Sequence, residues 1–178
     1  MKPFLILERE DAILTVRMDS PEPRNALSDP SQMQEFVDLC GIFAGAPYEV
    51  RESYRNGIQR IPLCLYDLDV PVIAAMNGPA IGAGLDLACM CDVRIAADTA
   101  KFAESFVKLG IVPGDGGAWL LPRIVGMPRA SLMALTGDMI DAQTALAWGL
   151  VTEVVPAAEL ETAALGIARR MADRKSTR

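Results

Sequence analysis

A glycine-rich turn after an apolar run is the feature that most constrains how this chain folds. Residues 70–76 are predicted to form a buried strand, and the turn at 77–84 (NGPAIGAG) leads from it directly into a helix. Gly78, Gly82 and Gly84 permit backbone angles closed to other residues and let a ligand approach the main chain. The first turn of a helix has unpaired N–H groups and the positive end of the helix dipole. This bend is therefore suited to hold a developing negative charge.

Two other interpretations of the turn stay open on the local pattern. A phosphate cradle is one, although the chain has no GxxxxGK[ST] motif and Gly82-Ala83-Gly84 does not extend to GxGxxG. The other is a tight strand-to-helix connection whose glycines serve packing alone, which is common in α/β proteins.

Composition limits the classes of protein that the chain can belong to. The 178 residues suffice for one domain with a real core, and the net charge of −6 is scattered, which argues against a nucleic-acid surface. No apolar run reaches membrane-spanning length. Glu8 and Glu10 in the N-terminal stretch do not fit a secretion signal, so we expect a cytoplasmic protein that contacts neither membrane nor nucleic acid.

The chain contains no histidine, which removes Ser-His-Asp and Cys-His nucleophile systems, HExxH zinc sites and imidazole acid–base chemistry together. Proton transfer must then fall to carboxylates, tyrosine, lysine or water. The four cysteines form no CxxC motif, so we predict buried free thiols and no metal site.

Predicted strands alternate with predicted helices, which indicates right-handed βαβ units and a mainly parallel sheet. Helix signals are sharpest at Asp141, predicted to cap 142–148, and at Gly149, predicted to end that helix. The other predicted elements are a hairpin at 4–10 and 12–18, a helix after Ser28, a helix at 48–66 kinked at Pro62, a helix ending near 92, strands at 93–97 and 151–155, and helices at 116–124, 128–135 and 157–172.

Residues 71–96 closely resemble the core signature of the crotonase superfamily, the enoyl-CoA hydratases and isomerases. The resemblance continues through 101–104, 109–117, 121–126, 135–138 and 142–151, and includes 24–28. It implies the α/β crotonase (ClpP-like) fold of stacked ββα units in a spiral, as a single core domain over 1–178. It also implies an acyl-CoA thioester as substrate, with coenzyme A as part of that substrate and no covalently bound cofactor, and assembly into a homotrimer or a dimer of trimers.

The chain departs from the family pattern in two places. Members continue after the first helix into a strand and an F-x-A-G-x-D loop that supplies the first oxyanion N–H, whereas Cys40 here is followed directly by Gly41. The resemblance also implies that most of the C-terminal helical region of the family pattern is lacking here. Either the gene carries a deletion at Cys40-Gly41 or a mobile loop is omitted from the residues as numbered, and we favour the second, because deleting a strand leaves hydrogen-bonding groups unpaired.

By the same resemblance, Ala83 takes the family's second oxyanion-hole position, between Gly82 and Gly84, so that its backbone N–H binds the thioester oxygen. Asp86 falls where hydratases carry their first catalytic glutamate, although a carboxylate in the first turn of a helix also simply favours the dipole. Arg24 and Ala26 match a loop that lines the coenzyme A tail in relatives.

The second catalytic glutamate of hydratases aligns with Phe106, which cannot move a proton. Glu104, two residues away, substitutes only if the loop differs. Asp115 is a further candidate base that follows Pro113 in a substrate-lining turn. Relatives place their aspartate one residue earlier, at Gly114, and Asp115 alternatively caps the next helix.

The function expected from these residues is stabilisation of a thioester enolate, with double-bond isomerisation favoured over hydration. The alternatives are hydrolysis of an acyl-CoA thioester and a crotonase homologue that binds acyl-CoA without turnover.

Overall fold

The computed structural model describes residues 5–18, 55–56 and 59–173, and it divides into two compact units. One unit comprises residues 1–60 and 167–178, and the other comprises residues 61–166. The predicted helix after Ser28, the coenzyme A contacts at Arg24 and Ala26, and the junction at Cys40-Gly41 lie outside the described residues.

In the first unit, the predicted hairpin is confirmed. Strand β1 (Leu5–Glu10) pairs antiparallel with β2 (Ile13–Met18), so that Leu5 lies opposite Met18. The turn between them places Asp11 at φ 52°, a left-handed conformation that aspartate tolerates better than most residues.

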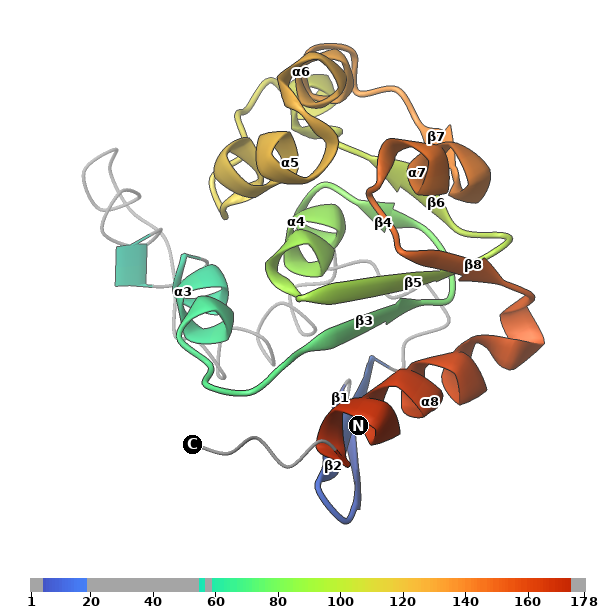
Figure 1. Cartoon of the computed structure of the whole chain (residues 1–178). Coiled ribbons are helices and arrows are strands. Elements are labelled where there is room, and N and C mark those ends of the chain that lie inside the picture. Colours follow the sequence, from blue (N-terminus) through green and yellow to red (C-terminus); the bar gives the residue numbers. More distant parts are fainter. Residues whose placement is uncertain (1–4, 19–54, 57–58, 174–178) are drawn as a thin grey trace. The chain divides into compact units, whose positions relative to one another are not determined.

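The second unit contains two short three-stranded sheets, and each strand–strand–helix repeat contributes one strand to each sheet (Figure 1). One sheet is parallel and has the order β3 (Ile73–Met76), β5 (Val93–Ala97), β8 (Glu153–Val155). The other has the order β4 (Ala80–Ile81), β6 (Lys101–Ala103), β7 (Ile140–Asp141), with only β7 antiparallel. Because β3 pairs with β5 and β4 with β6, the unit β3–β4–α4 stacks on the unit β5–β6–α5.

Most helices follow the predicted order with small shifts at their ends. The helices are α3 (Arg60–Tyr66), α4 (Ala83–Met90), η1 (Phe106–Leu109), α5 (Gly117–Val125), α6 (Met127–Thr136), α7 (Ala142–Trp148), η2 (Ala157–Glu159) and α8 (Leu160–Ala172). The helix predicted at 48–66 is an exception, because residue 59 is a turn and α3 begins only at Arg60, and η1 was not predicted.

Three local predictions can be compared with these bounds. The Asp141 carboxylate accepts the Thr144 amide at 2.8 Å and caps α7 as predicted, and Gly149 ends that helix in the left-handed conformation. Pro62 lies in the first turn of α3, where its missing N–H costs no hydrogen bond, and does not mark a kink. The strand predicted from Val70 begins only at Ile73.

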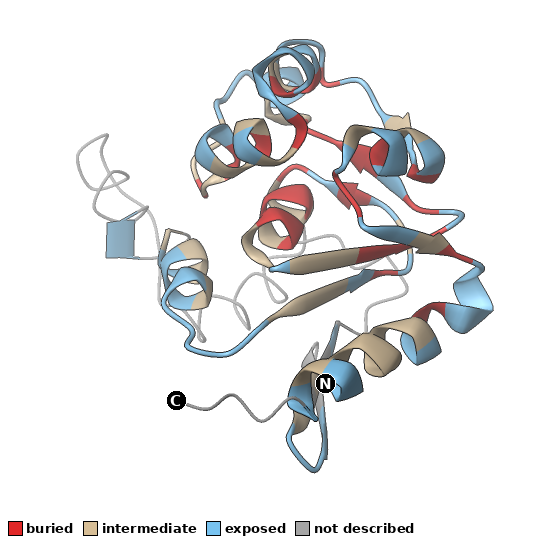
Figure 2. Ribbon diagram, in the orientation of Figure 1, coloured by how far each residue is buried: buried red, intermediate tan, exposed pale blue. Residues whose placement is uncertain are grey.

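The apolar core of the second unit surrounds α4, whose ribbon carries the buried colour along much of its length (Figure 2). Leu85 and Phe102 are fully buried, and burial of a side chain of this size stabilises the fold by about 1.5–3 kcal/mol. Asp86 is as completely buried as its apolar neighbour Leu85. The core therefore holds α4 rigidly, with its first turn at the end of β4.

Candidate active site

Gly82 makes the turn between β4 and α4. It adopts φ 55° and ψ −121°, a region open essentially to glycine alone, and its N–H donates to the Ala103 carbonyl at 2.8 Å. Its own carbonyl accepts the amides of Leu85 and Asp86 at 2.9 and 3.0 Å, so Gly82 is the N-cap residue of α4. The special backbone angle predicted for this turn is therefore present at Gly82.

The prediction of unusual angles at Gly78 and Gly84 is wrong, because neither glycine has a positive φ. A Cβ added at either position meets no described atom within 4 Å. The space beside Gly84, in the first turn of α4, is therefore open in the described part of the structure.

Ala83 is the first residue of α4 and is half-buried. Neither its N–H nor that of Gly84 donates a hydrogen bond to another residue that the structure describes. These amides are the orphan donors expected at a helix N-terminus. The geometry thus leaves the Ala83 amide unpaired, as an oxyanion donor must be before its ligand binds.

Asp86 lies one turn further along α4 and has no exposed surface. The amide of Gly117, the first residue of α5, donates to Asp86 Oδ2 at 3.0 Å. A Cβ at Gly117 would lie 1.9 Å from Asp86 Oδ1, so only glycine allows this approach. The Asp86 carboxyl is therefore fixed against α5 and does not extend into solvent beside the helix dipole.

Two further carboxyl groups belong to the same buried site. Glu104 directly follows β6 and is 1% exposed, and Asp115 precedes α5 and is 6% exposed. Asp86 interacts through its side chain with both of them. Within the described part of the chain, Asp86 Oδ1, both Glu104 oxygens and Asp115 Oδ1 have no hydrogen-bond donor. The alternative role of Asp115 as a helix cap is wrong, because α5 has Gly116 as its N-cap residue and no side-chain cap.

Burial is the main reason why protons bind tightly here. The pKa of Asp86 is raised to about 10. The largest cause is desolvation, followed by the side-chain contact with Asp115 and the charge of Glu104. Desolvation also raises the pKa of Glu104 to about 7. The side-chain contact with Asp86 opposes that shift, and the Asp115 charge adds to it. Asp86 and Glu104 therefore titrate as a pair that holds at least one proton at neutral pH.

Phe106 lies beside the glycine turn. A Cβ on Gly82 would be 3.6 Å from Phe106 Cζ and 3.7 Å from Ser105 Oγ. An aromatic ring thus borders the turn on this side. The carboxylate that the structure supplies nearby is Glu104, which sequence reasoning gave only a minor part. Its signal was present in the sequence, since Glu104 and Phe102 are two residues apart at the end of a strand and share a face.

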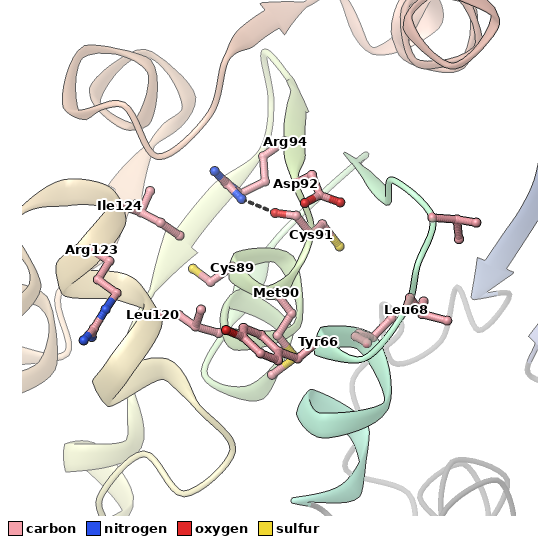
Figure 3. A pocket seen from close by; sticks show the side chains of 12 residues that line it. Tyr66, Leu68, Cys89, Met90, Cys91, Asp92, Arg94, Leu120, Arg123 and Ile124 are labelled. Carbon is pink, nitrogen blue, oxygen red and sulfur yellow. Dashed lines mark hydrogen bonds between the residues drawn. The ribbon is translucent and has the colours of Figure 1, made fainter. Parts of the chain in front are cut away.

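A pocket of about 340 Å³ opens at the other end of α4, between α3, α4 and α5 (Figure 3). Tyr66, Met90 and Arg123 are among its lining residues, whereas Ala83 and Asp86 are not. Arg94, which also lines it, donates to the carbonyls of Cys91 and Leu150 and is thereby held in the fold. The pocket and the site of the three carboxyl groups are therefore separate features of this unit.

Pro113, predicted to line the substrate site, lies half-buried in the loop before Asp115.

Of the described cysteines, Cys89 is buried and Cys91 is half-buried. Cys64 is exposed, so the prediction of buried thiols is wrong for this residue. All three are free thiols.

No group of three or more His, Cys, Asp or Glu side chains among the described residues could hold a metal ion. None of the helices in this part of the chain is long and apolar enough to cross a membrane.

Comparison with known proteins places this geometry in a family. The sequence profile of the enoyl-CoA hydratase/isomerase family matches residues 37–178. The chain is 46% identical to the 1,2-epoxyphenylacetyl-CoA isomerase of Escherichia coli, over 97% of this chain and 77% of that protein. It is 40% identical to the crotonyl-CoA hydratase of Syntrophomonas wolfei, over 87% of this chain and 60% of that protein.

Solved structures agree with the sequence comparison. A probable enoyl-CoA hydratase/isomerase from Mycobacterium abscessus superposes with a TM-score of 0.81 at 32% identity, over 96% of this chain and 76% of that one. The fold is thus the α/β crotonase fold. The chain belongs to the enoyl-CoA hydratase/isomerase family, which is a family of enzymes acting on acyl-CoA thioesters.

The chain is shorter than its relatives. It spans between 42% and 77% of the length of four curated relatives that it matches. Its alignment with the Escherichia coli isomerase covers 202 positions, more than the 178 residues of this chain, so that relative has positions without a counterpart here.

Proposed function

We propose that this chain binds an acyl-CoA thioester at the start of α4, stabilises its enolate through the Ala83 N–H, and shifts a double bond in preference to adding water. The observation that carries this proposal is the unpaired Ala83 amide, one turn before the buried Asp86 carboxyl. One amide donor aimed at a developing oxyanion can contribute about 3 kcal/mol to the transition state. Gly82 and Gly84 leave the main chain open for the thioester to approach.

Isomerisation requires one group that takes a proton from one carbon and returns it to another. In the fraction of molecules whose Asp86 is ionised, Asp86 accepts a proton from the α-carbon of a 3-enoyl thioester. The electron pair of the broken C–H bond moves into the dienolate, whose oxygen accepts the Ala83 N–H. Asp86 then returns the proton to the γ-carbon, where the new C–H bond forms. The thioester ends with its double bond moved and Asp86 ionised again.

Hydration requires a second proton-transferring group, which this site does not supply. One group must orient and deprotonate water while another protonates carbon. Phe106 lies against Gly82, where a second acid would be needed, and a phenyl ring holds no proton. The similarity to a 1,2-epoxyphenylacetyl-CoA isomerase supports isomerisation, whereas the similarity to a crotonyl-CoA hydratase supports hydration, so the preference rests on Phe106. The similarity to a fatty acid oxidation complex subunit is compatible with a fatty acyl substrate.

A second candidate is an acyl-CoA-binding protein without turnover. The complete burial of Asp86 favours it, since a carboxyl with no exposed surface can serve packing alone. Contacts of Arg24, Ala26, Phe106 and Pro113 with the substrate, assembly into a trimer or a dimer of trimers, and a cytoplasmic location are further proposals. Sedimentation of the protein tests the assembly.

Substrate assays with Asp86→Asn separate these candidates. The wild-type protein should isomerise a 3-enoyl-CoA faster than it hydrates crotonyl-CoA. Asp86→Asn should lose isomerisation while it keeps its affinity for the acyl-CoA, measured by calorimetry. Equal binding with no turnover in either protein would favour the non-catalytic candidate, and rapid hydration of crotonyl-CoA by the wild type would contradict the reasoning from Phe106.

A further inference from the structure

Glu104 is a buried carboxyl that the proposed isomerisation does not use. It is 1% exposed, and neither of its oxygens has a hydrogen-bond donor in the described part of the chain. An ionised carboxylate in such surroundings is strongly penalised, because nothing replaces the water that it has lost. A neutral, protonated carboxyl would escape most of that penalty.

The neighbours of Glu104 do not supply a compensating charge. Asp86 and Asp115 are the groups that act on its pKa, and both are acids. Cys89, on the same helix as Asp86, is close enough for the charges of Asp86 and Glu104 to act on it. Burial raises the pKa of its thiol to about 12, so it stays neutral. Among the residues that the structure describes, the Gly117 amide is the only hydrogen-bond donor to the three carboxyls, and it donates to Asp86 Oδ2.

Two carboxyls that face each other in a dry site resolve this conflict by sharing a proton. One of them then donates an O–H and the other accepts it, which satisfies oxygens that otherwise have no partner. Burial gives Asp86 the higher pKa of the two, so the shared proton lies on Asp86 in most molecules. The Gly117 N–H stabilises the minority form in which Asp86 is ionised and Glu104 holds the proton.

We propose that Asp86 and Glu104 form a buried acid pair that shares one proton, with Glu104 as a positioning residue that stays neutral while the enolate forms. The part that Glu104 plays in turnover rests on the proposed function, whereas the shared proton does not. While Asp86 holds the substrate proton, Glu104 keeps its own, so the enolate is then the only negative charge on the reacting atoms and the acid pair. No proton is gained or lost over the cycle.

The test follows the side-chain carboxyl resonances of Asp86 and Glu104 by 13C NMR as the pH is raised, without ligand. In the wild type, both resonances should move together in two shared steps, which is the signature of coupled groups. Glu104→Gln is nearly isosteric, and its amide donates to Asp86. In that variant Asp86 should titrate in one step, at a pH lower by about one unit or more. Glu153→Gln, at an exposed carboxylate on β8, is the matched control and should leave both resonances unchanged.

Two outcomes overturn the proposal. One is a single titration step of Asp86 in the wild type with the same midpoint in Glu104→Gln. The other is loss of the shared steps in Asp115→Asn while Glu104→Gln retains them, since the proton would then be shared with Asp115.

A turnover measurement adds an independent readout. The acidic limb of the pH profile of kcat should move to lower pH in Glu104→Gln, in parallel with the Asp86 resonance, whereas a merely structural role would leave the profile in place. Absence of isomerisation by the wild type refutes the proposed function, and the NMR titration still decides on the pair.

Discussion

Gly117→Ala is the substitution whose effect follows most directly from the structure. Its new Cβ would lie 1.9 Å from Asp86 Oδ1 and 2.4 Å from Oδ2, so the carboxyl must leave its position. Gly117 has no positive φ, and alanine can therefore adopt its backbone conformation. The contact with Asp86 is the reason for the expected loss of stability.

The loss has two sources. Overpacking of a buried site costs about 1–3 kcal/mol. The displaced carboxyl also gives up the hydrogen bond from the Gly117 amide at 3.0 Å, a bond to a neutral carboxyl worth about 0.5–1.5 kcal/mol. Allowing for partial relaxation, we expect about 2–4 kcal/mol in the free energy of unfolding, and a fall in Tm of about 5–15 °C.

Urea and thermal unfolding measure this loss, and two variants isolate its cause. Gly78→Ala is the matched control, because a Cβ there meets no described atom within 4 Å, and it should unfold like the wild type. In the double variant Asp86→Ala/Gly117→Ala, the new methyl group enters the space left by the carboxyl, so the two losses should be far from additive. Wild-type stability of Gly117→Ala, or additive losses in the double variant, would refute the packing of Asp86 against α5.

Three further predictions concern the same site. Gly82→Ala should lose about 1–3 kcal/mol in urea unfolding, because φ 55° with ψ −121° strains any residue with a Cβ, and unchanged stability would contradict that backbone geometry. The pKa values of Asp86 and Glu104 are raised in the folded state, so stability should fall as the pH rises from about 4 through about 7 and on towards about 10, by up to about 1.4 kcal/mol per pH unit for each group. Asp86→Asn should reduce the dependence of the unfolding free energy on pH, measured by urea unfolding at several pH values. An equal dependence in both proteins would contradict the raised pKa of Asp86. Phe106→Glu supplies a second acid beside Gly82 and should increase the rate of crotonyl-CoA hydration, measured as the loss of enoyl absorbance. An unchanged rate would contradict the role assigned to Phe106.

Sequence reasoning succeeded where the physical cause is local. The cap at Asp141 and the stop at Gly149 depend on hydrogen bonds within a few residues, and the structure has both. Gly82 was identified for the same reason, since one turn between a strand and a helix requires its backbone angle. The strand start at Val70 failed because Val70 and Pro71 are apolar in composition but exposed in the fold.

The carboxyl site was only partly predictable because it depends on tertiary contacts. Asp86 was chosen by position, but its burial against Gly117 joins residues 31 positions apart in the chain. Asp115 looked like a helix cap because aspartate before a helix usually is one, whereas here its carboxyl faces Asp86. Glu104 reaches the site through the pairing of β6 with β4, and a two-residue strand inside a glycine turn gives almost no sequence signal.

The claim on which the account depends is that the N–H of residue 83 receives the thioester oxygen, and Ala83→Pro removes that one donor. Proline is well tolerated at the first position of a helix, so α4 should persist, as circular dichroism can verify. With Ala83→Gly as the variant that keeps the N–H, Ala83→Pro should isomerise a 3-enoyl-CoA about 100-fold more slowly or worse. Equal turnover by the two folded variants would contradict an oxyanion hole at Ala83.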